Sequence, residues 1–297
     1  MIDFLHALTN PDMKFLLYAT LTGVVASVAF GIVGTYVVVR RITYIAGAIA
    51  HCILGGIGIA LYLQGHFHIA WITPMLGAVV SALFSALVIG MVSMYGKQRE
   101  DAVISAMWAV GMALGVLFIA ITPGYLSPMS YLFGDILMVS RTDFYIVIAL
   151  DVVIILLCLL FYNKFLAVCF DEYFARIKGV RVDFYYLLLL CLTALTIVLL
   201  ISVVGLIMVI ALLTLPAAIA GHFTNRLWKM MVLAILLSIF FTCSGLALSF
   251  SWNLPSGSVI IILAGSCYLL VAAGCLAGRK LLNRRAVNTV NQETIEQ

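Results

Sequence analysis

Two ionisable side chains lie inside long apolar stretches of this sequence. His51 stands near the middle of RRITYIAGAIAHCILGGIG (40–58), and Asp151 lies part of the way into a later apolar stretch. A polar group in hydrocarbon costs on the order of several kcal/mol unless it finds a partner, so each residue is a hypothesis for a functional site. Asp151 could pair with His51 or with a hydroxyl group on another helix. The structural alternatives are a backbone hydrogen bond for His51 and a carboxylate that reaches towards the membrane surface for Asp151.

Glycines surround His51 on one face of the helix that this stretch predicts. With about 3.6 residues per turn, Gly47, His51, Gly55 and Gly58 fall along one stripe. Glycine lets neighbouring backbones approach closely, which is typical of contacts between membrane helices. We therefore expect His51 to face protein or water, and the three glycines to line any path that passes the histidine.

No other motif offers catalytic chemistry, so we do not expect an enzyme or a permanently bound cofactor. The stretch GMVSMYGKQ (90–98) has the wrong glycine spacing for a phosphate-binding loop and lacks a hydroxyl residue after its lysine. HExxH, GxSxG and paired carboxylates are absent from the apolar stretches. His66 and His68 form an HxH pair, for which two solvated histidines are the favoured interpretation. The seven cysteines stand singly and predict packing, not a metal or disulfide framework.

The composition indicates a membrane protein. Hydrophobic residues make up 65% of the 297 residues and charged residues 9%, whereas a soluble domain has roughly 25% charged residues. We expect an all-α polytopic membrane protein with eight or nine transmembrane helices, each close to the ~20 residues that cross the hydrocarbon. The number depends on residues 184–222, which form either two spans with a tight turn near Gly205 or one span plus a broken piece. The expected spans are residues 15–39, 44–63, 70–95, 103–122, 144–162, 184–203, 205–221, 229–250 and 257–277.

The basic residues predict the orientation and favour nine spans. With the N-terminus outside, one side of the membrane receives only Lys14 and Arg141, and all other Lys and Arg residues fall on the opposite side. Such an excess marks the cytoplasmic side, which therefore also holds the C-terminus. The net charge of +4 reflects this bias, and nothing in the sequence suggests a nucleic-acid surface.

The chain is expected to form a single transmembrane domain, residues 1–278, followed by a mobile cytoplasmic tail, residues 279–297. The tail is polar and shows no apolar periodicity. The outer connection, residues 123–143, is too apolar for a solvated loop, and its YLFGDIL portion predicts a short helix packed on the outer face.

A cytoplasmic connection, residues 163–184, has the pattern of a docking element. Phe170, Phe174 and Ile177 recur at i, i+4 and i+7, which predicts an amphipathic helix that ends at Gly179. The helix either docks on a protein partner or lies flat on the lipid headgroups. Two acidic residues near its start favour a protein partner, because they fit an anionic surface poorly.

These features together favour a transporter. Because the chain has no nucleotide site of its own, it is either an ion-coupled secondary carrier or the membrane subunit of an ATP-driven machine. The docking helix favours the second, and a carrier would need more buried carboxylates than Asp151 alone.

Six stretches, in order along nearly the whole chain, carry a family resemblance. They are VVRRITYIAGAIAHCILGG, DAVISAMWAVGMALG, YLFGDIL, FDEYFARIKGVRVDFYYLLLL, VGLIMVIALLTLPAAIAGHF and SFSWNLPSGSVIIIL. With them the chain resembles the membrane permease subunit of bacterial metal-ion ABC importers, the zinc/manganese/iron group. The resemblance implies a fold like that of the vitamin B12 importer, a permease homodimer or paired homologous permeases, two ABC ATPase subunits that bind ATP, and an extracytoplasmic metal-binding protein. The transported cargo would be a divalent metal ion, and the location the bacterial cytoplasmic (inner) membrane.

The same resemblance assigns residue roles. FDEYFARIKGV is similar to the segment that inserts into the ATPase, which gives a coupling role to Phe170, Asp171, Glu172, Phe174, Ala175 and Gly179. His51 would lie on the metal pathway, with Asp151 as a further candidate, and Pro216 is a candidate bend point in its helix.

One position departs from the family pattern. Members usually carry an aspartate four residues before the histidine, which places a carboxylate and an imidazole on one helix face beside a passing divalent ion. Here that residue is Gly47. The pathway is then less attractive to cations, or Asp151 or a backbone carbonyl substitutes. Import of a chelated metal or a vitamin-like solute by the same fold remains the alternative.

Overall fold

A computed structural model describes residues 14–67, 71–96, 100–122 and 140–295. This part of the chain is all helical, and nine of its helices are long and apolar enough to cross a membrane. The expected all-α polytopic fold is confirmed, with nine candidate spans instead of eight. The helices are α2 (Lys14–Val39), α3 (Thr43–Phe67), α4 (Pro74–Tyr95), α5 (Glu100–Ile121), α7 (Arg141–Phe170), α8 (Glu172–Ile177), α9 (Val182–Val204), α10 (Leu206–Phe223), α11 (Leu227–Trp252) and α12 (Ser256–Ile295).

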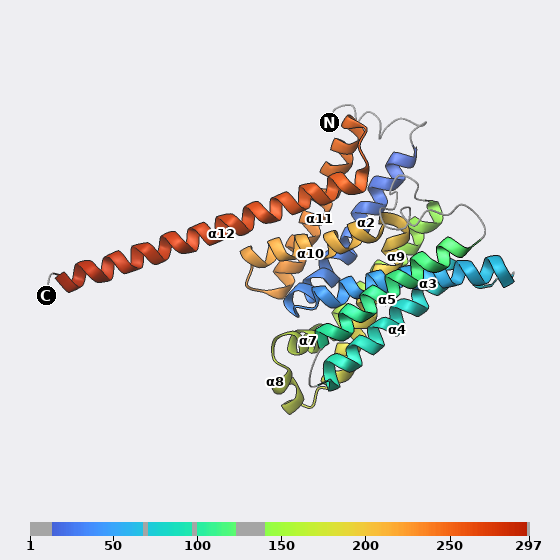
Figure 1. Cartoon of the computed structure of the whole chain (residues 1–297). Helices are drawn as coiled ribbons and strands as arrows, with labels where there is room; N and C mark the ends of the chain where they lie inside the picture. Colours follow the sequence, from blue (N-terminus) through green and yellow to red (C-terminus); the bar gives the residue numbers. More distant parts are fainter. Residues whose placement is uncertain (1–13, 68–70, 97–99, 123–139, 296–297) are drawn as a thin grey trace.

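Two groups of helices form the bundle (Figure 1). In the first group α3 packs against α4 and α5; in the second α2 packs against α7, α10 and α11, and α12 packs against α10 and α11. Helix α9 contacts α3 and α4 on one side and α2, α7 and α10 on the other, so it joins the groups. α12 continues beyond the bundle to Ile295, so the residues expected to form a tail continue its helix (Figure 1).

Gly205 separates α9 from α10 by a single residue. Its φ of 86° lies in the left-handed region, where a residue without a Cβ is favoured. The helices on both sides are long enough to span, which resolves residues 184–222 into two candidate spans.

The docking connection differs from the expected single amphipathic helix. Helix α7 runs on to Phe170, and Asp171, with φ −150° and ψ 97°, breaks the chain before the six-residue α8. Phe170 therefore ends one helix, and Phe174 and Ile177 belong to another. The periodicity alone could not show this break, because the Asp171 side chain accepts a hydrogen bond from the Phe174 backbone N–H at 2.9 Å and so starts a new helix.

Candidate translocation and coupling site

The imidazole of His51 lies against an aromatic ring of α5. Its ring stacks on Trp108 with the centroids 4.4 Å apart and the planes 15° from parallel. His51 is partly exposed, and its Nδ1 is buried with no hydrogen-bond partner among the described residues. The backbone hydrogen bond that the structural alternative required is thus not formed in this part of the chain. Among the residues that the structure describes, the Nδ1 atom of His51 is thus free of protein partners.

Tyr44, about two turns before His51, extends the aromatic contact towards the start of α3. Its ring centroid lies 5.9 Å from that of Trp108, and its hydroxyl group bonds the Ser105 hydroxyl group. The sequence offered no signal for Trp108 beyond its place in an apolar stretch. Its role beside His51 depends on how α3 and α5 pack.

Asp151 lies elsewhere in the bundle. It is 5% exposed on α7, the helix that packs on α2, α8 and α9. Neither carboxylate oxygen has a hydrogen-bond partner in the described part of the chain, and no ion pair joins it to His51 there. The structure therefore does not bring the two intramembrane candidates together.

Two of the three glycines on the His51 stripe lie against the backbone of α5. A Cβ on Gly55 would stand 2.7 Å from the Gly111 carbonyl oxygen, and one on Gly58 would stand 2.7 Å from the Gly115 oxygen. Such distances leave no room for a side chain, so both positions serve close helix packing. Their role in lining a path stays a prediction.

Gly47 lies in a more open place. It borders a groove of about 530 Å³ between α3, α5, α10 and α12, whose lining includes Arg41, Tyr44, Trp108 and Thr214. A Cβ on Gly47 would meet only Trp108, at 3.7 Å, which is ordinary van der Waals contact. Position 47 can thus accommodate a larger side chain. Steric hindrance therefore does not explain why this chain lacks a carboxylate there. The groove lining contains one arginine and no carboxylate.

A permanent metal centre is not formed by the residues that the structure describes. No group of three or more His, Cys, Asp or Glu side chains is arranged there to hold an ion. His68 and the YLFGDIL stretch lie outside the described residues. Pro216 is buried inside α10, which continues as helix on both sides of it. Its role as a bend point stays a prediction.

The segment predicted to couple to an ATPase contains both exposed side chains and a buried one. Phe170 and Phe174 are 66% and 52% exposed, whereas Ala175 is 1% exposed. Gly179, with φ 75°, ends the turn after α8 and has open space around it. The segment therefore presents aromatic side chains outwards while Ala175 anchors it.

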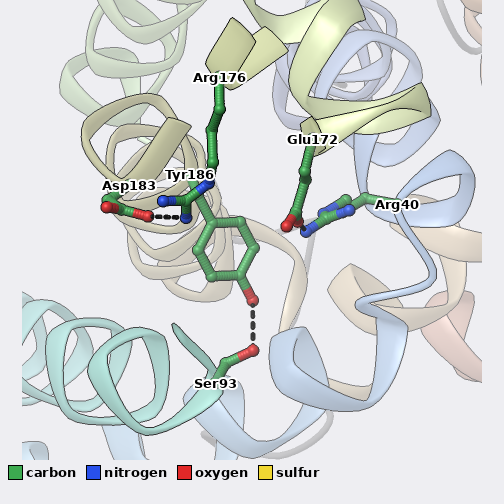
Figure 2. A network of polar contacts seen from close by, with 6 residues as sticks. All are labelled: Arg40, Ser93, Glu172, Arg176, Asp183 and Tyr186. Atoms are coloured by element: carbon green, nitrogen blue, oxygen red, sulfur yellow. Dashed lines mark hydrogen bonds and ion pairs between the residues drawn. The ribbon is translucent and has the colours of Figure 1, made fainter. Parts of the chain in front are cut away.

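Two ion pairs tie α8 to neighbouring elements (Figure 2). Glu172 pairs with Arg40 at the end of α2, and Arg176 pairs with Asp183 at the start of α9 at 2.5 Å. The Arg40 guanidinium group also lies over the Tyr186 ring, 5.2 Å from its centroid. Glu172, assigned to the coupling role by resemblance, thus has its partner within this chain.

A groove of about 650 Å³ lies beside these residues. It runs between the end of α7, α8 and the α10–α11 connection, and its lining includes Phe170, Asp171, Phe174, Arg226 and Trp228. Exposed aromatic side chains with both charges at the rim are typical of a protein contact surface.

Comparison with known proteins gives consistent matches over most of the chain. A "Probable metal transport system membrane protein" of Chlamydia muridarum is 40% identical over 290 residues, 97% of this chain and 94% of that one. The "Manganese transport system membrane protein MntC" of Listeria monocytogenes is 32% identical over 252 residues, 84% of this chain and 87% of that one. Among solved structures, PsaBC from Streptococcus pneumoniae in complex with a Fab is similar with a TM-score of 0.80 and 30% identity, covering 91% of this chain and 95% of that one.

The match to a family is equally extensive. Residues 12–274 match the family described as ABC 3 transport, and they include α3 with His51, the α8 segment and Pro216. The nine candidate spans and the likeness to PsaBC agree with that match. The chain belongs to the ABC 3 transport family.

Proposed function

We propose that this chain is the transmembrane subunit of an ATP-driven ABC importer that moves a divalent transition-metal ion across the bacterial cytoplasmic membrane. The observation that supports this most strongly is the family match over residues 12–274, together with relatives named for metal and manganese transport at 40% and 32% identity. ATP hydrolysis belongs to a separate ATPase subunit, and this chain is not itself catalytic.

In this proposal the end of the bundle that carries α8 faces the cytoplasm. Phe170 and Phe174, with the adjoining groove, supply the ATPase contact surface. The permease works as a homodimer or with a homologous permease, and an extracytoplasmic metal-binding protein delivers the ion to the outer face. Closure of the paired ATPases then moves the coupling segments and switches access to the path.

His51 is proposed as a transient ligand on that path. An imidazole nitrogen is a good ligand for zinc, manganese and iron, and the Trp108 stack fixes the plane of the ring. A single histidine binds weakly, which suits an ion that must leave again. Asp151 is buried away from His51 and is proposed for the path only in another conformation.

The second candidate is a permease for a chelated metal or a vitamin-like solute. The groove beside Gly47 favours it, because its lining includes Arg41 and no carboxylate. A ligand that carries its metal inside an organic chelate needs no protein carboxylate.

The test is ATPase stimulation in a reconstituted complex with the binding protein, loaded in turn with zinc, manganese or iron. Stimulation by one bare ion above the others supports the proposed function and identifies the cargo. Stimulation only by a metal–chelate complex supports the second candidate. A chain that transports metal in liposomes without an ATPase is a secondary carrier, and that result contradicts both.

A further inference from the structure

Helix α8 is too short to hold its own position. It has six residues, whereas isolated helices shorter than about 12–15 residues are marginal in water. Its place in the molecule therefore depends on its anchors. These are its connection to α7 through Asp171, the buried Ala175, and the two ion pairs.

The two ion pairs connect α8 to different parts of the bundle. Arg176 pairs with Asp183, which belongs to the first turn of α9, the next helix along the chain. Glu172 pairs with Arg40, which is more than a hundred residues away in sequence and lies where α2 ends. Only the second pair links the coupling segment directly to the corner between α2 and α3.

Backbone hydrogen bonds hold the corner between α2 and α3. The backbone N–H groups of Arg40, Arg41 and Ile42 donate to the carbonyl oxygens of Tyr36, Val38 and Val37 at 2.9, 3.1 and 3.0 Å. Arg41 has a φ of 61°, a left-handed conformation that turns the chain sharply into α3. A displacement of Arg40 therefore reaches the first turn of α3, the helix that carries His51.

Arg40 also contacts a second side chain, besides Glu172. It lies over the ring of Tyr186 in α9, and the Tyr186 hydroxyl group donates to the Ser93 hydroxyl oxygen near the end of α4 at 3.1 Å (Figure 2). Side chains from α8 and α9 thus meet at Arg40, and Tyr186 connects this contact to α4. The side chains of Arg40 and Glu172 are only 23% and 36% exposed, which limits competition from water.

We propose that Arg40 is the positioning residue that transmits the movement of the coupling helix to α3, through its ion pair with Glu172. This inference rests on the proposed function, because it requires an ATPase that moves α8. It assigns Glu172 to contact within the permease and leaves the ATPase contact to the exposed aromatic side chains of the segment.

The experiment compares charge variants in proteoliposomes that contain the complete complex, with Mn²⁺-loaded binding protein as the probe. The measured quantity is Mn²⁺ transported per ATP hydrolysed, together with the amount of ATPase that co-purifies. A residue that merely stabilises the fold would change the yield of complex and leave this ratio alone. The variants are Arg40→Ala, Arg40→Glu, Glu172→Arg and the double exchange Arg40→Glu/Glu172→Arg.

We expect each single variant to lower the transport-to-hydrolysis ratio by about fivefold or more, and the double exchange to restore most of it. The matched control is Arg181→Ala, which removes a positive charge from the same connection. The Arg181 side chain forms no ion pair among the described residues, so the ratio should stay at the wild-type value.

An unchanged ratio in Arg40→Ala, in a complex whose wild type transports Mn²⁺, overturns this inference alone. If the single variants do not assemble, the double exchange decides: a double variant that assembles with a low ratio also overturns it. A wild-type chain that binds no ATPase overturns the proposed function, and this inference with it.

Discussion

At the scale of single residues, the main candidate for metal binding is the imidazole of His51, which lies against an aromatic ring. Trp108 fixes the His51 ring, and no carboxylate among the described residues pairs with it. Asp151 is the more deeply buried of the two intramembrane groups, but it lies on α7, which packs on α2, α8 and α9. The path residue we propose is therefore His51.

His51→Ala is expected to lower metal uptake by the reconstituted complex by about tenfold, equivalent to ~1.4 kcal/mol in the barrier, because the imidazole ligand proposed for the path is lost. The measurement is the initial rate of uptake of Mn²⁺ or Zn²⁺, with metal-stimulated ATPase activity recorded in parallel. His222→Ala is the control, since His222 is an exposed histidine at the end of α10. Equal uptake and ATPase stimulation by His51→Ala and the wild type would remove His51 from the path.

At the scale of helices, α3 uses glycines on two of its faces to contact the neighbouring helices α4 and α5 closely. Gly55 and Gly58 meet the α5 backbone at Gly111 and Gly115, and Gly56 meets the α4 backbone at Gly77. Interfaces of this kind gain their stability from van der Waals contact between backbones, because lipid removes the hydrophobic driving force between helices. The helix that carries His51 is thus held rigidly along its middle and later turns, while its first turn borders the groove.

Gly55→Ala should destabilise the protein by about 1–3 kcal/mol, because its Cβ would stand 2.7 Å from a backbone oxygen that cannot move alone. Thermal unfolding in detergent, followed by the loss of monodisperse protein, measures the effect. Gly265→Ala in α12 is the matched control, because nothing lies within 4 Å of the Cβ it would add. Equal midpoints for the two variants would show that α3 and α5 are not held by this contact.

At the scale of the whole molecule, one end of the bundle exposes large apolar side chains beside a groove. Tyr173 and Ile177 are 85% and 84% exposed on α8, and Phe170 and Phe174 line the groove that continues to Trp228. In the proposed function, the six-residue α8, held by two ion pairs and the buried Ala175, is the part of this end that an ATPase moves. This arrangement suits a segment that receives force from another subunit.

Phe174→Ser should reduce the ATPase that co-purifies with the permease by about tenfold, because an exposed aromatic side chain that becomes buried on binding contributes on the order of 2 kcal/mol to an interface. The measurement is the amount of ATPase pulled down by each permease variant at a fixed permease concentration. Tyr145→Ser is the matched control, since Tyr145 is also an exposed aromatic residue and lies near the start of α7, the opposite end of that helix from α8. Full retention of the ATPase by Phe174→Ser would place the contact surface elsewhere.

The sequence alone determined the class of protein and limited the number of spans to eight or nine, and it predicted the position of the coupling segment. Each of these depends on local composition: a run of about twenty apolar residues crosses a membrane whatever it packs against. The predicted turn at Gly205 is also confirmed. The stretches on both sides of it are each long enough to span the membrane.

The tertiary structure decided which helix faces meet, and this cannot be deduced from hydropathy in chains that are apolar on all sides. It placed Trp108 on His51, separated Asp151 from His51, and turned Gly55 and Gly58 towards α5. It also broke the expected amphipathic helix at Asp171, because a capping side chain there outweighed the apolar periodicity. The partner of Glu172 was equally beyond the sequence, since Arg40 comes beside it only when the end of α2 and the start of α8 fold to the same place.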